Sequence, residues 1–106
     1  MYWITFPTLE STVAANFEMV GDKMECQSLY TFTGNATCDG WGGITLDECK
    51  AKCNNNEVPS ATCPRQNVTC VYVYYSNYKV SWCHLGDDAC LPLKPNANGI
   101  VFKKRG

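Results

Sequence analysis

The sequence predicts a small disulfide-rich α+β domain, and three observations support this fold class. The chain has 106 residues, which is the length of one domain. It contains eight cysteines, an even number at a density typical of proteins that fold in an oxidising compartment. Several segments alternate apolar and polar residues as strands do, and one short segment carries the start signal of a helix. Because a core of this size is modest, disulfide bonds should supply part of the stability.

The first 24 residues contain no cysteine, and we predict that they form a strand-like N-terminal extension to a domain spanning residues 25–106. Apolar residues alternate from Tyr2 to Phe6, before Pro7, and again from Val13 to Met19. The segment is too apolar for a linker, so we expect it to pack on its own domain or on a neighbouring copy. It lacks the basic start and apolar run of a signal peptide, which indicates a mature protein or an excised segment.

The next segments predict a strand at residues 29–33, a turn at Gly34-Asn35 and a pliable glycine loop at residues 39–43. The clearest local signal follows at Thr45-Leu46-Asp47-Glu48, a capping box with Thr45 as the N-cap. It predicts a helix from Leu46 to Asn54. Cys49 and Cys53 are four residues apart and therefore share one face of this helix, so that the helix can be bonded to two partners.

Three strands are predicted in the last third of the chain. Residues 70–75 are rich in Val and Tyr, residues 76–79 have turn composition, and residues 80–85 return as a second strand of the same hairpin. A loop with Pro92 and Pro95 then leads to a closing strand at residues 100–103.

Three cysteine motifs resemble the PAN/apple domain family over roughly residues 25–104. They are the helical Cys49-Lys-Ala-Lys-Cys53, the strand Cys70-Val-Tyr72-Val-Tyr74 and the strand Cys83-His-Leu85, and Gly99-Ile-Val-Phe102 suits the last strand of the family. The resemblance implies a curved antiparallel sheet that cradles one short helix, with disulfides Cys49–Cys83 and Cys53–Cys70. It also implies an extracellular module that binds proteins or glycans, often in adhesion.

The remaining four cysteines have no pairing that the resemblance implies, because the family often ties its termini together and the last strand here has no cysteine. Three pairings are open for Cys26, Cys38, Cys63 and Cys90. We favour Cys26–Cys38 with Cys63–Cys90, because the second bond would brace neighbouring loops.

The implied disulfides also assign strand faces. If Cys70 and Cys83 point at the helix, then Tyr72, Tyr74, Ser81 and Leu85 do so too. The opposite face would then carry Val71, Val73, Tyr75, Val80, Trp82 and His84. We expect this apolar surface to be covered by Tyr2, Ile4 and Phe6, and to be the ligand-binding surface if it is open.

The candidate ligand-binding or partner-binding residues are mainly aromatic, because sugars and proteins bind to aromatic faces rimmed by polar groups. They are Trp41, Tyr75, Tyr78, Trp82 and His84. An alternative is a self-assembling structural subunit of an extracellular filament or coat, in which the N-terminal segment packs on the next copy. Sequons at Asn35 and Asn67 predict a secreted or cell-surface glycoprotein.

Other classes of function are not expected. We predict no enzyme, because the only histidine is His84 and all eight cysteines have a covalent role. No metal or cofactor is expected, since the cysteine spacings suit disulfides better than zinc and Asp87-Asp88 suits a solvated loop. The net charge is −1, with one basic cluster at residues 103–105, so nucleic acid is not an expected partner. No apolar run is long enough for membrane insertion.

Overall fold

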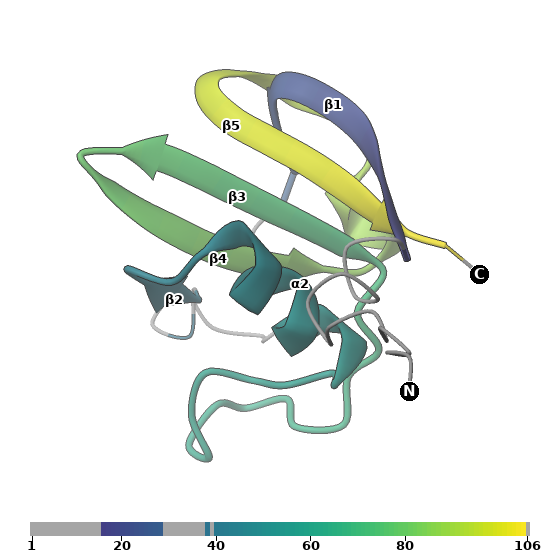
Figure 1. Ribbon diagram of the computed structural model, residues 1–106. Coiled ribbons are helices and arrows are strands. Elements are labelled where there is room, and N and C mark those ends of the chain that lie inside the picture. The colour runs from purple at the N-terminus through teal and green to yellow at the C-terminus, as the bar shows by residue number, and fades with distance from the viewer. Residues whose placement is uncertain (1–15, 29–37, 39, 106) are drawn as a thin grey trace, which may run out of the picture.

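The chain folds into one antiparallel sheet of five strands with a helix against one face (Figure 1). The computed structural model describes residues 16–28, 38 and 40–105. The strands follow the order β1–β5–β3–β4–β2 across the sheet. Their bounds, with those of helix α2 and the 3₁₀ turn η1, are β1 Phe17–Glu25, β2 Trp41–Gly42, α2 Leu46–Asn54, β3 Tyr72–Tyr78, β4 Val80–Gly86, η1 Asp88–Cys90 and β5 Lys94–Lys104. With four disulfides, this is the small α+β domain that the sequence predicted.

Helix α2 has the predicted bounds, and the capping box that begins it is confirmed. The Thr45 hydroxyl oxygen accepts a hydrogen bond from the Glu48 N–H at 3.1 Å, and the Glu48 carboxylate accepts one from the Thr45 N–H at 2.8 Å. Hydrogen bonds to the Glu48 carboxylate, from the Thr45 backbone first and then from the Thr45 side chain, lower the pKa of Glu48. Just before the cap, the Ile44 carbonyl accepts hydrogen bonds from the Tyr75 and Ser81 hydroxyls, which ties the helix start to the hairpin.

Two disulfides fasten α2 to the sheet. Cys49 is bonded to Cys83 in β4, and Cys53 is bonded to Cys70, which lies just before β3. These are the two pairs that the family resemblance implied. The four sulfur-bearing side chains are almost completely buried and form part of the main core between helix and sheet.

The favoured pairing of the other four cysteines was wrong. The structure joins Cys26 to Cys90 and Cys38 to Cys63. Cys26 directly follows strand β1 and packs with Cys90 in a second core cluster, on the sheet face opposite the helix. Cys63 belongs to the loop between α2 and β3, where it is bonded to Cys38.

The face assigned to β4 was right, but the face assigned to β3 was wrong. Val73 and Tyr75 pack in the helix-side core with Cys83 and Leu85, whereas Tyr72 and Tyr74 lie on the far face. The error arose because the alternation was counted from Cys70. Cys70 lies two residues before β3, where the chain is not yet in regular strand geometry, so the period of two does not extend back to it.

Strand β1 joins the N-terminal part of the described chain to the C-terminal strand. It pairs with β5 so that Phe17 lies opposite Lys104, and hydrogen bonds thus connect regions near the two termini without a disulfide. The boundary predicted between residues 24 and 25 falls inside β1. The predictions made for Tyr2, Ile4 and Phe6, for the strand at 29–33 and for Asn35 lie outside the described residues.

Lys50 lies on the inner side of α2 and is buried in an aromatic setting. Its ammonium nitrogen is 4.1 Å from the ring centroid of Phe102 and 5.9 Å from that of Phe17. Burial lowers the pKa of Lys50, and the nearby Asp47 charge acts in the opposite direction. Attraction between the ammonium and the ring faces offsets part of the cost of removing the charge from water.

The far face of the sheet is covered over part of its area. Strands β1 and β5 curl over it (Figure 1), and Met24, Cys26, Cys90 and Leu93 pack on Tyr72, Tyr74 and Val101. Gly99 permits the close approach, because a Cβ there would lie 2.4 Å from the Met24 carbonyl oxygen and 2.6 Å from the Tyr74 ring. At this end, the far face is thus covered by residues 24–26 and the loop before β5.

Candidate ligand-binding face

The five candidate residues divide between the two faces of the sheet. Trp41 and Tyr75 are half-buried on the helix side, where both pack against the main core. The Tyr75 hydroxyl donates to the Ile44 carbonyl at 2.6 Å, and the Trp41 ring lies under the Lys52 ammonium at 5.4 Å from its centroid. Both residues therefore have packing partners within the domain, and they lie apart from the other three candidates.

The far face of the β3–β4 hairpin carries the other candidates. Tyr78 and Val80 face each other across the hairpin end and are 61% and 57% exposed, and Trp82 is 36% exposed. We call Tyr78, Val80 and Trp82 the hairpin face. Lys79, with φ 63°, makes the tight connection between the strands, so the turn is narrower than the predicted residues 76–79.

A row of rings extends from the hairpin face toward the covered part of the sheet. His84 is buried between Trp82 and Tyr74, with ring centroids 6.1 Å and 5.2 Å away and interplanar angles of 22° and 17°. Asn96 donates to the Tyr74 hydroxyl at 2.8 Å and also to the Glu25 carboxylate. Burial raises the pKa of Tyr74, a hydrogen bond with Ser76 lowers it, and the Glu25 charge raises it further.

Trp82 stands in a cross-strand row whose other members are small. Gly42 of β2 lies opposite it on one side, Ser76 of β3 lies opposite it on the other, and Gly99 of β5 follows Ser76. Directly opposite residues share a sheet face, so no large side chain stands beside the indole in this row. The side chains directly across from Trp82 on the neighbouring strands are therefore all small.

Sequence reasoning found Tyr78, Trp82 and His84 but missed Gly42, Ser76 and Tyr74. The missing information was the pairing of β2 with β4. Strand β2 has only two residues, and nothing in their pattern predicts which strand they join. Tyr74 was missed because of the phase error in β3 described above.

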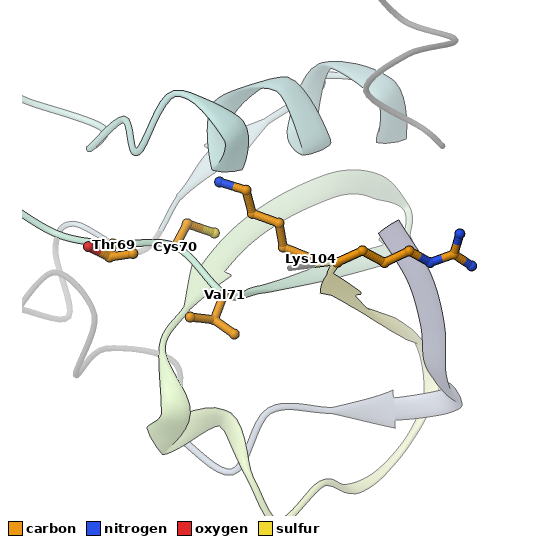
Figure 2. Close-up of a pocket in the computed structure, with 5 residues that line it drawn as sticks. Thr69, Cys70, Val71 and Lys104 are labelled. Atoms are coloured by element: carbon orange, nitrogen blue, oxygen red, sulfur yellow. The ribbon is translucent and has the colours of Figure 1, made fainter. Parts of the chain in front are cut away.

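A second feature is a shallow hollow near the C-terminal end of β5. Thr69, Cys70, Val71, Lys104 and Arg105 line it. Figure 2 shows the Lys104 ammonium extending toward α2 while Val71 points away from the helix. In the parts of the chain that the structure describes, no three side chains of the His, Cys, Asp or Glu type converge to form a metal site.

The fold and its bonds define a small disulfide-rich α+β domain, with one helix joined covalently to one face of a five-stranded antiparallel sheet. Among the described residues, no helix is long and apolar enough to cross a membrane. No family model, curated protein or solved structure matches the chain.

Proposed function

We propose that the chain is a non-catalytic extracellular binding module of the PAN/apple type, and that the hairpin face contacts its ligand. Two features support the family assignment: helix α2 on a curved antiparallel sheet, and disulfides that join Cys49 to Cys83 and Cys53 to Cys70. All eight cysteines are paired, which favours an oxidising, extracellular location. Asn67 is exposed in the loop before β3, as a glycosylated residue must be.

The observation that carries the binding proposal is the exposure of three large apolar side chains together at the end of one hairpin. Tyr78, Val80 and Trp82 lie on adjacent positions of one sheet face, and His84 and Tyr74 support the innermost of them. A contiguous exposed apolar patch on a stable framework is typical of a contact surface for a protein or a sugar.

A binding screen tests this proposal. The oxidised full chain is applied to a glycan array and to immobilised extracellular-matrix proteins, beside two variants. The triple variant Tyr78→Ser/Val80→Ser/Trp82→Ala removes the hairpin face. Met19→Ser is the matched control, because Met19 is 54% exposed on a strand at the other edge of the sheet.

We expect saturable binding to at least one immobilised ligand, lost in the triple variant and kept by Met19→Ser. Saturable binding that survives in the triple variant would contradict the assignment of the hairpin face. Absence of saturable binding to both kinds of surface would contradict the proposed function itself. The extracellular assignment is checked by secretion from eukaryotic cells, where Asn67→Gln should lower the glycosylated mass.

A further inference from the structure

The indole of Trp82 lies flat over strand β2. A Cβ added to Gly42 would be 3.5–3.6 Å from the Cη2, Cζ2 and Cε2 atoms of Trp82. These three atoms are consecutive in the six-membered ring, so their near-equal distances place Gly42 against the ring face and not against its edge. One face of the indole therefore rests on the backbone of β2, while the residue as a whole is 36% exposed.

Gly42 can lie under the indole because its missing side chain leaves room for the ring, and not because of its backbone conformation. Among the described glycines, positive φ occurs at Gly40 and Gly43 and not at Gly42. A single added methyl group would meet the indole at ordinary van der Waals distance, whereas a β-branched side chain would extend further and lift the ring. Aromatic rings commonly cover a cross-strand glycine at a sheet edge in this way.

The size of the hairpin face favours a small ligand over a protein. A stable protein interface takes roughly 20–30 residues from each side. On this face, the described part of the chain exposes three large apolar side chains together, Tyr78, Val80 and Trp82. A ligand that makes most of its contact with one flat ring matches this area better than a second folded chain does.

The charges on this face favour a neutral ligand that is apolar on one side and polar at its edge. The residues of β2, β3 and β4 that share the far face are uncharged, from Gly42 across to Tyr74, Ser76, Tyr78, Val80, Trp82 and His84. The nearest charge that the structure places on this face is the Lys79 ammonium at the hairpin end, 5.4 Å from the Tyr78 ring centroid. Ser76 lies directly opposite Trp82, Tyr78 is the next residue of β3 on the same face, and their hydroxyls can hydrogen-bond with polar groups. A pyranose ring has this form, with C–H bonds on one face and hydroxyls around its edge.

We propose that Trp82 is the stacking platform of a binding site for neutral pyranose sugars, and that Gly42 is the positioning residue that keeps its indole flat. This inference rests on the proposed function, and it names the ligand class of the hairpin face. The electron-rich face of the indole attracts the polarised C–H bonds of the sugar, and the hydroxyls of Ser76 and Tyr78 fix its orientation.

Saturation-transfer NMR on the oxidised full chain tests the proposal with three probes: methyl β-galactopyranoside, methyl β-glucopyranoside and methyl α-mannopyranoside. We expect at least one probe to bind with a millimolar dissociation constant and to shift the indole N–H signal of Trp82. Trp82→Ala should weaken binding by about tenfold or more, which corresponds to at least 1.4 kcal/mol. Gly42→Val should weaken it by several-fold, Gly42→Ala by less, and Met19→Ser should have no effect.

The sugar site would be overturned by the absence of saturation transfer to all three probes, or by equal affinity of the Trp82→Ala variant. An unchanged affinity in Gly42→Val would overturn the role given to Gly42. Trp82→Phe, which keeps a smaller ring, is measured as well, so that a folding defect in Trp82→Ala does not decide the outcome. If the sugars fail while a matrix protein still binds through the hairpin face, the proposed function stands and the ligand class is wrong. If sedimentation shows dimers that Trp82→Ala dissociates, the occupant is a second copy and the sugar site is likewise overturned.

Discussion

Removal of the Cys26–Cys90 disulfide by a Cys26→Ala/Cys90→Ala double variant should cost roughly 3.5 kcal/mol of stability. The bond joins the end of β1 to η1, across 64 residues of sequence. The other three bonds still shorten the unfolded chain, because a path through Cys49–Cys83 leaves a loop of roughly 30 residues to be closed. Chain entropy for a loop of that length gives the quoted figure, whereas the full sequence separation would give about 4.3 kcal/mol.

The assay is urea unfolding of the double variant under non-reducing conditions, followed by a free-thiol determination. We expect a lower urea concentration at the midpoint of unfolding. The dependence of the unfolding free energy on urea concentration should be unchanged or steeper, because the unfolded chain becomes more expanded. We also expect no free thiol, since Cys38 and Cys63 remain bonded to each other. Two free thiols per chain would show that the pairing is wrong. A loss of stability below about 1 kcal/mol would refute the loop-entropy reasoning.

Three further variants test the helix and the main core. Thr45→Ala removes the helix cap and should cost about 1 kcal/mol in urea unfolding, whereas Thr45→Ser should be nearly neutral. Val73→Ala should cost about 2 kcal/mol, because Val73 is fully buried on the helix side; a loss no larger than that of the half-buried Val71→Ala would contradict the face described above. Lys50 has a folded-state pKa below its unfolded value of 10.5, so the penalty for its buried charge is relieved as the pH rises between those two values. Wild type should therefore gain stability relative to Lys50→Met as the pH rises toward 10.5, and a flat difference up to that pH would contradict the lowered pKa.

The parts of the fold that sequence could predict are those with local signals. Thr45 and Glu48 lie three residues apart and fix the helix start through their own hydrogen bonds, so the capping box gave the correct first residue of the helix. The hairpin of β3 and β4 was also predicted, because its strands are adjacent in sequence and rich in Val and Tyr.

The parts that sequence could not predict depend on contacts between distant segments. The N–H of Val71 donates to Gly86 and its carbonyl accepts from Lys104, and these long-range bonds precede the regular part of β3. The phase of β3 relative to Cys70 is therefore not fixed by the local sequence. The same reason applies to Cys26–Cys90 and to Gly42, whose position under Trp82 exists only after β2 has paired with β4.

The framework that holds the hairpin and the face proposed to bind a ligand lie on opposite sides of the same two strands. Cys49–Cys83 and Cys53–Cys70 hold β3 and β4 from the helix side, and β1 covers the far face only as far as Tyr74 and Val101. The rows nearer the hairpin end contribute little to either core cluster, so their side chains are available for contact with a ligand. It follows that Trp82→Ala should reduce stability by less than the loss of one disulfide, while it removes most of the binding. If Trp82→Ala reduced the free energy of unfolding as much as the loss of one disulfide does, Trp82 would mainly support the fold.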